Sequence, residues 1–287
     1  MGFLLAFLTA LFASLKDLSS KIGLKKDINE YIVGFGWRFF ALPIFVVVLL
    51  FQGIPTIEKS FWIPFIISGS INTIVTILFV KALKYSDISK VTPLISFTPL
   101  FLLITSPIIL GESPSGWGYL GVITIVFGSY LLNFKKISNN LFSPFTSLIK
   151  ERGTRYMLLV AILWSVSANF DKIAVQSSAP VFYVFMTNFL ISTIFFIILI
   201  SKRISLKPIR NNYKNLIPIG LFVSIANICQ MYAITLTIVP YVIAIKRTSI
   251  IFNIIWGKIF LKEKETLWRF VAALVMIGGV IMILVLN

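Results

Sequence analysis

The sequence contains no histidine and only one cysteine, Cys229, among its 287 residues. Without histidine a Ser-His-Asp triad cannot form, and one cysteine excludes both an intrachain disulfide and a Cys/His metal site. No Walker-type phosphate loop is found either. Charged residues make up 13% of the chain, about half of the ~25% that is usual in soluble domains. We therefore expect neither an enzyme nor a protein with a metal ion or cofactor.

What the chain does have is apolar sequence, which accounts for 58% of its residues and recurs in long runs from end to end. Each run is long enough to cross ~30 Å of hydrocarbon as a helix. The first run lacks a basic n-region and a cleavage site, so we interpret it as a membrane helix rather than a signal peptide. The sequence thus predicts an all-α polytopic membrane protein with ten transmembrane helices, at about 3–22, 31–51, 62–82, 89–110, 116–134, 155–174, 181–201, 215–235, 240–261 and 267–286.

The positive charge of the chain follows the predicted helices. A net charge of +16 could suggest nucleic acid, but the cations concentrate in short loops, as membrane topology requires. All but six of the 26 Lys and Arg residues lie in or beside loops that follow odd-numbered helices. We therefore expect the lipid bilayer as a partner and no nucleic acid. The six exceptions are Lys59 and Lys172 after even-numbered helices, and Lys16, Arg38, Lys246 and Arg247 within helices.

The two halves of the chain resemble each other when one is shifted by 151 positions. An odd number of helices per half makes the second half enter the membrane from the opposite side, so the repeat is inverted and predicts a substrate site at its interface near mid-membrane. We divide the chain into a first five-helix repeat (1–134), a basic linker (135–154) and a second repeat (155–287). The matches are Ser14 with Ser165, Lys21-Ile22 with Lys172-Ile173, Gly69 with Gly220, Ala82 with Ala233, Phe101 with Phe252, Glu112 with Glu263, Trp117 with Trp268 and Gly128 with Gly279.

The end of each fourth helix carries a further pattern. Thr92-Pro93 and Thr98-Pro99-Leu100-Phe101 lead to Leu110-Gly111-Glu112, and the next helix contains Gly121 and Gly128; the second half has Phe260-Leu261-Lys262-Glu263, Trp268 and Gly278-Gly279. Together with the repeat, this pattern resembles the drug/metabolite transporter superfamily in its ten-helix form with two EamA-type repeats. The second half departs from it, with Ala244 opposite Pro93 and Ile250 opposite Pro99.

The resemblance implies a secondary transporter that moves a small molecule by alternating access. We expect it in the cytoplasmic membrane of a prokaryote, as a monomer or a homodimer. Ten-helix relatives of known structure generally have both termini inside, whereas the charge bias places both termini outside.

The ninth predicted helix contains two adjacent cations, Lys246 and Arg247. One charge at membrane depth costs at least ~2.5–3.5 kcal/mol, so the pair predicts a wet cavity, an anionic partner or an anionic substrate. Sugar-phosphate translocators of the same superfamily bind phosphate with a Lys-Arg pair in the ninth helix and a Lys in the fourth, which implies the same role for Lys90. The alternative is that both cations snorkel to the headgroups.

Other polar residues within the predicted helices are candidates for the substrate site or for coupling. Amides in membrane helices either line a cavity or form interhelix hydrogen bonds worth ~0.6–2 kcal/mol. Lys16 and Asp17 form either a gate with a proton site at Asp17 or a self-neutralising group, since Asp17 and Lys21 are spaced i, i+4. The further candidates for the lining are Trp37, Arg38, Asn72, Asn188, Asn227, Gln230 and Tyr232.

Three groups of residues carry structural expectations. Glu112 and Glu263 stand where a helix meets a turn, as interfacial carboxylates or as a gate, and the inverted repeat places them on opposite membrane faces. Small residues let helices approach closely, so we expect Gly121, Gly128 and Gly279 to serve packing. Pro93 and Pro99 predict a kink beside the cavity in the fourth helix.

Our first hypothesis for function is a carrier for a small organic anion, including phosphorylated metabolites. One alternative is an exporter of amino acids or amphipathic metabolites that relies on the polar amides. Another is a flippase for a lipid phosphate, because a basic site could also bind that group.

The charge bias predicts the orientation. A reporter that is active only in the cytoplasm should be inactive when fused after Asn287 and active when inserted after Asn140, in the loop that follows the fifth helix. Activity after Asn287 would show that both termini are inside and that the charge bias does not set the orientation.

Overall fold

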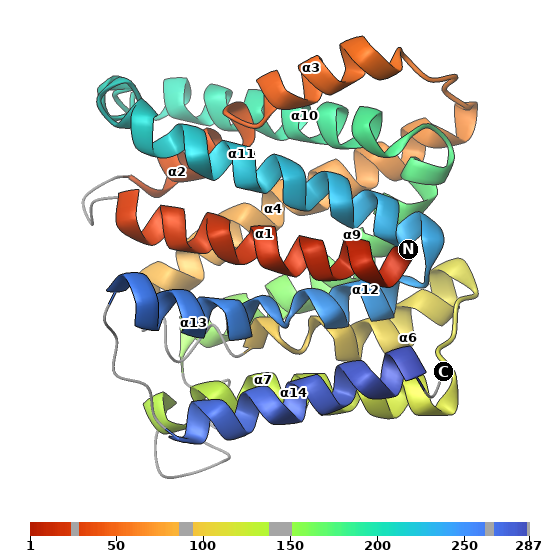
Figure 1. Ribbon diagram of the computed structural model, residues 1–287. Coiled ribbons are helices and arrows are strands. Elements are labelled where there is room, and N and C mark those ends of the chain that lie inside the picture. Colours follow the sequence, from red (N-terminus) through yellow and green to blue (C-terminus); the bar gives the residue numbers. More distant parts are fainter. Residues whose placement is uncertain (24–28, 86–93, 138–150, 262–266, 286–287) are drawn as a thin grey trace.

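The computed structural model describes residues 1–23, 29–85, 94–137, 151–261 and 267–285, and within these residues it is helical with no strand. The helices run side by side along one axis (Figure 1), as a membrane requires of spanning segments. In chain order they are α1 (Gly2–Gly23), α2 (Glu30–Phe39), α3 (Leu42–Gln52), the 3-10 turn η1 (Lys59–Phe61), α4 (Trp62–Tyr85), α6 (Thr98–Leu110), α7 (Gly116–Ile137), α9 (Arg152–Gln176), α10 (Pro180–Ser201), α11 (Lys207–Leu236), α12 (Val239–Lys246), α13 (Ser249–Leu261) and α14 (Leu267–Val285).

These elements confirm the polytopic all-α fold. Seven segments of the described chain are long and apolar enough to cross a membrane. Three shorter apolar helices, Thr98–Leu110, Gly116–Leu131 and Val271–Val285, stand at the remaining predicted positions. Two predicted spans consist of two helices each, since α2 and α3 form the second span and α12 and α13 the ninth.

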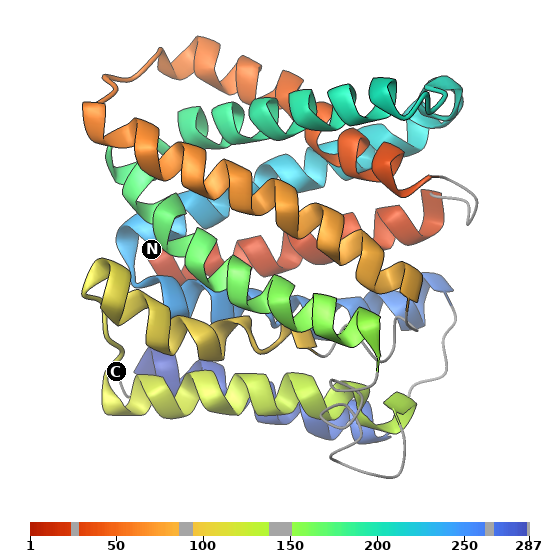
Figure 2. The ribbon, with the colours of Figure 1, turned by 180° about the vertical axis from the view of Figure 1, so that it is seen from behind.

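The two halves are interleaved rather than set beside each other. The first helix of the first half, α1, packs chiefly against α11 and α13 of the second half. Its counterpart α9 packs in the same way against α4 and α6 of the first half, and Figure 2 shows α4 in orange and α9 in green running side by side on the rear face. The last helices, α7 and α14, pair with each other, as do α2 and α10. Every one of these pairings maps onto another, or onto itself, when the halves are exchanged, as a pseudo-two-fold axis requires.

The halves also run in opposite directions. In Figure 1, α6 of the first half ends on the right, whereas its counterpart α13 in the second half ends on the left. The first helix, α1, runs from right to left. We call the end of the molecule that holds the chain termini the terminal end, and the end where α1 and α13 finish the loop end. Glu112 follows α6 at the terminal end. Glu263 falls outside the described residues, as do Lys90 and Pro93, so the expected arrangement of the two glutamates stays a prediction.

Both fourth helices are interrupted at equivalent positions. A turn at Ser96 and Phe97 precedes α6, and a turn at Arg247 and Thr248 separates α12 from α13. The 151-residue shift superimposes these two turns. The amides of Phe97 and Thr248 bond three residues back, to Leu94 at 3.1 Å and Ile245 at 2.9 Å. Pro99 lies beside the first turn, but the second forms without a proline, so the two halves bend alike despite their sequence difference.

Two boundaries differ from the sequence expectation. The second span is broken at Phe40 and Ala41, directly before Pro43 near the start of α3. Proline is tolerated in the first turn of a helix but not in its interior, which explains the new start. The eighth span, α11, begins at Lys207 rather than near 215, so cations assigned to a loop form its first turns.

The pairing of α7 with α14 depends on small residues. A methyl group at Gly121 would lie 2.8 Å from the carbonyl oxygen of Gly279, and one at Gly279 would lie 2.7 Å from that of Gly121. A methyl group at Gly128 would meet the carbonyl oxygen of Ala272 at 2.9 Å. These glycines therefore let the two backbones touch. Gly278 has open space around its Cα.

We expect Gly279→Ala to destabilise the protein, because backbone atoms on the facing helix cannot move away. Overpacking of this kind costs about 1–3 kcal/mol of unfolding free energy. Gly278→Ala is the matched control and should be neutral or stabilising, since alanine favours helix over glycine by up to about 1 kcal/mol. Thermal unfolding in detergent measures both. Equal midpoints for the two variants would contradict the packing role.

Candidate functional site

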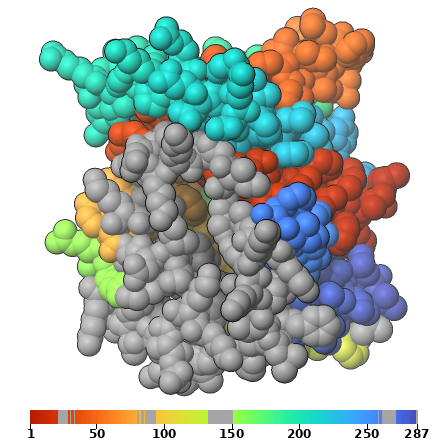
Figure 3. Space-filling model, turned by 60° about the vertical axis from the view of Figure 1, so that its left-hand side comes forward, coloured from red at the N-terminus to blue at the C-terminus, as the bar shows by residue number. Residues whose placement is uncertain are grey.

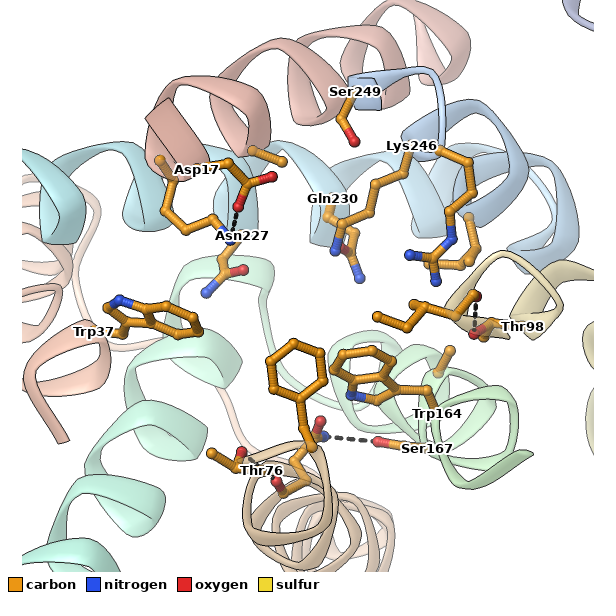
Figure 4. A pocket seen from close by; sticks show the side chains of 18 of the residues that line it. Asp17, Trp37, Thr76, Thr98, Trp164, Ser167, Asn227, Gln230, Lys246 and Ser249 are labelled. Atoms are coloured by element: carbon orange, nitrogen blue, oxygen red, sulfur yellow. Dashed lines mark hydrogen bonds and ion pairs between the residues drawn. The ribbon is translucent and has the colours of Figure 1, made fainter. Parts of the chain in front are cut away.

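A cavity of about 710 Å³ lies between the two halves. Figure 4 shows its polar side chains, contributed by helices from both halves and facing one central space. Among the described residues the charged lining consists of four cations and two carboxylates, Lys16, Arg38, Lys246, Arg247, Asp17 and Asp171. A site of mixed charge at the interface of inverted repeats is the arrangement expected of a carrier.

The cavity extends toward the loop end. Asp17, Asn253 and Trp256 line it, and they lie in the last two turns or so of α1 and α13. The Asp17 side chain is 43% exposed. Figure 3 turns this end toward the viewer, with α11 in cyan and α13 in blue. The cavity therefore communicates with the loop end.

The terminal end is closed by α12 and by an ion pair. Residues Val239–Ile245 of α12 are all buried. The ammonium group of Lys172 pairs with Glu112 Oε1 and donates a hydrogen bond to the Thr237 carbonyl oxygen at 2.9 Å. Glu112 Oε2 accepts a bond from the Val239 amide at 3.2 Å. Glu112 thus ties the first half to α9 and α12 of the second half. Lys172 lies within α9 and not in a loop, contrary to the sequence expectation.

The turn between α12 and α13 presents the basic pair to the cavity. Lys246 ends α12, and its Nζ donates to Gln230 Oε1 at 2.6 Å. Arg247 occupies the turn itself, and its Nε is buried with no hydrogen-bond partner among the described residues. Figure 4 shows Lys246 and Gln230 together on one wall, facing Trp164 on the opposite wall. Both cations point into the protein interior, which is not the placement that snorkelling requires.

Arg38 and Asn188 meet across the halves, as residues of the second and seventh spans. Arg38 Nη1 donates to Asn188 Oδ1 at 3.2 Å, and Asn188 is fully engaged because its amide nitrogen donates to the Val184 carbonyl oxygen at 2.6 Å. Asn72 donates to Ser167 Oγ at 2.7 Å. These amides both line the cavity and connect helices, so the two sequence interpretations apply to the same residues.

Asp171 is a cavity residue that the sequence interpretation missed. Its Oδ1 accepts hydrogen bonds from the hydroxyl groups of Ser68 and Tyr183, and the carboxylate is 9% exposed. The available signal was an acid inside an apolar run, which marks a functional site by default. Counting the neighbouring Lys172 with the loop cations hid it, although the predicted span 155–174 contains both residues.

Lys16 and Asp17 form an ion pair at the open side of the cavity. Lys16 Nζ also lies 4.9 Å from the centre of the Trp37 ring, a cation–π distance. Asp17 Oδ2 accepts a bond from Asn253 at 3.1 Å, and this bond links α1 to α13. Their roles as a gate or as a proton site stay predictions.

Of the other candidates, Asn227 and Gln230 line the cavity and Tyr232 does not. The Tyr232 hydroxyl instead accepts a hydrogen bond from Gln52 at 3.4 Å. Its position two residues after Gln230 turns it to another face of α11.

Comparison with known proteins agrees with this architecture. A model of the EamA-like transporter family matches residues 1–134 and 152–285. The chain belongs to the EamA-like transporter family. No curated protein matches the chain. A solved structure described only as "Crystal structure of protein" is similar in fold, with a TM-score of 0.82 and 13% sequence identity over 99% of this chain and 97% of the other. The family is one of transporters and not of enzymes, as the sequence predicted.

We expect Glu112→Gln to loosen the closed terminal end, because Lys172 would keep its buried charge without a counter-charge. Breaking one side of a buried pair costs about 3 kcal/mol or more of unfolding free energy. The double variant Glu112→Gln/Lys172→Met should recover part of that loss. Denaturation midpoints of both single variants and the double variant in detergent give the coupling energy. Additive losses would show that the pair does not hold this end together.

Proposed function

The family identifies a membrane transporter of small solutes, and we propose that its substrate is a small organic anion with a carboxylate or phosphate group. The observation that carries this proposal is the buried Nε of Arg247 beside Lys246, which has no hydrogen-bond partner within the described part of the chain. A buried donor without an acceptor costs free energy that an anionic substrate would recover. The planar guanidinium suits carboxylate and phosphate oxygens, and the ammonium group adds a point charge.

The charge balance of the cavity supports an anion. Four cations face two carboxylates, and one cation, Lys16, is already paired with Asp17. The three remaining cations, Arg38, Lys246 and Arg247, exceed the single remaining carboxylate, Asp171. In the described part of the chain, none of the three has a carboxylate within ion-pair distance. A bound anion would offset this excess charge.

The rest of the lining suits the organic part of such a substrate. Trp37, Phe79, Trp164 and Trp256 contribute apolar surface, and cavities that hold small molecules combine such surface with a few oriented polar groups. Transport would follow alternating access. The present structure is closed at the terminal end, and rocking of the two halves would open that end and close the loop end. We place the carrier in the cytoplasmic membrane of a prokaryote.

A zwitterionic metabolite such as an amino acid is the second candidate. Asp171 contributes a carboxylate to the same cavity, so an ammonium group could bind there while the carboxylate of the substrate meets Arg247. A thermal-shift screen of the purified protein against phosphorylated, carboxylic and zwitterionic metabolites separates the two. A ligand at 100 times its Kd adds roughly 2.7 kcal/mol of apparent stability.

We expect Arg247→Lys and Lys246→Gln each to weaken binding of the anion that the screen identifies. Charge-assisted bonds of this kind are worth roughly 1.5–3 kcal/mol, or about 10- to 150-fold in Kd. Arg247→Lys keeps the charge but loses the planar fork, so its effect tests geometry rather than charge. Ligand affinity of variants purified in detergent is the measurement.

The matched controls are Arg210→Lys and Lys202→Gln, which lie outside the cavity and should bind as the wild type does. If Arg247→Lys and Lys246→Gln both bind the anion unchanged, the basic pair is not the substrate site. The amide-lined exporter would then be the better interpretation.

A further inference from the structure

Asp171 has one engaged oxygen and one free oxygen. The Ser68 and Tyr183 hydroxyl groups both bond to Oδ1. Oδ2 has no hydrogen-bond partner among the described residues, although the side chain borders the cavity. Buried polar atoms usually have a hydrogen-bond partner, so a carboxylate oxygen without one beside a cavity calls for an explanation. The free oxygen of Asp171 is therefore available to a proton or a cavity ligand.

Each helix around Asp171 contributes groups that face this carboxylate or the cavity beside it. From α4 come the uncharged Ser68 and Asn72, and from α10 the Tyr183 hydroxyl. The charges of Arg38 on α2 and Lys246 on α12 act on Asp171 from a distance, since neither is within ion-pair range. The remaining charged residues of the lining are Arg247, Lys16 and Asp17.

Asp171, Arg38, Lys246 and Arg247 all line the same cavity. An anion bound by Lys246 and Arg247 would therefore enter the region that the Asp171 charge already influences. Two negative charges in a poorly hydrated site repel each other strongly. Binding of the anion and ionisation of Asp171 consequently oppose each other.

We propose that Asp171 takes up one proton when the anion binds, so that the carrier moves a proton and an anion together. The inference rests on the proposed anion substrate and adds its coupling. The proton comes from the aqueous side to which the cavity is open and binds at Oδ2, while Ser68 and Tyr183 hold Oδ1. After the halves rock, loss of the proton restores the negative charge and expels the anion on the other side. Reciprocity requires that the proton strengthen anion binding by the same factor as the anion strengthens proton binding.

The test uses inorganic sulfate and benzenesulfonate as probes, because their own charge stays constant between about pH 5 and about pH 9, so that a change in affinity over this range reports on the protein. Affinity for the full-length protein in detergent is measured across this range. In the wild type, the affinity of the probe should fall by about 5- to 150-fold from low to high pH, the usual size of such coupling. Asp171→Asn should bind with the low-pH affinity throughout, because the amide is uncharged and can still accept both hydroxyl bonds.

Two controls locate the effect. Asp17→Asn removes the other carboxylate of the cavity and should keep the pH dependence, which distinguishes Asp171 from Asp17 as the proton site. Glu58→Gln changes a carboxylate that accepts a bond from Ser60 and lies outside the cavity lining. This variant should also keep the pH dependence of probe affinity.

Tyr183→Phe removes one donor to the ionised form of Asp171, so the affinity of the probe should start to fall at a higher pH. This variant tests the coupling even if Asp171→Asn does not fold.

The following outcomes would each contradict the proposed coupling. Sulfate binding that depends on Arg247 but has the same pH profile in the wild type and in Asp171→Asn would overturn the coupling and leave the anion site intact. Sulfate affinity that does not change with pH in the wild type would also overturn the coupling and leave the anion site intact. If neither probe nor any anion of the metabolite panel binds, the anion site itself fails, and the coupling fails with it.

Discussion

The cost of placing charge inside a membrane governs this structure. Each ionised group at depth requires compensation by an opposite charge, a hydrogen-bond partner or water. Lys172 and Glu112 compensate each other at the terminal end, and Lys16 and Asp17 do so near the loop end. Between these pairs, Arg38 and Lys246 bond to amides, and no carboxylate of the described residues lies within ion-pair distance of Arg38, Lys246 or Arg247. The excess of cations is therefore confined to the centre of the molecule, where a substrate can supply the missing charge.

The interleaving of the halves determines where that centre lies. Because α1 packs on α11 and α13, and α9 on α4 and α6, the cavity is lined by residues of both halves. The turns at Ser96 and Arg247 interrupt the two equivalent helices at the same depth. Interrupted helices expose polar backbone, which is tolerated in a membrane only where it meets protein or a wet cavity. The fold thus brings polar backbone, cations and amides to one place.

Much of this organisation can be derived from the sequence. Hydrophobic length predicts the ten spans, and the 151-residue shift predicts the inverted repeat. The adjacent cations in an apolar run indicate a functional site, and Lys246 and Arg247 do lie at the cavity. Sequence could not show that Lys172 reaches Glu112, because that pair depends on how the two halves dock. Asp171 was missed although it lies inside the sixth predicted span, because its neighbour Lys172 was counted with the loop cations.

The exchange of first helices has a consequence for biosynthesis. The main partners of α1, the helices α11 and α13, are the eighth and ninth spans to leave the ribosome. The chain must therefore hold α1 in the bilayer without its native neighbours until most of the protein is made. Its Lys16–Asp17 pair lies between adjacent residues and needs no other helix, so it can lower the cost of those two charges during that interval. The first half alone therefore lacks the main packing partners of its own first helix.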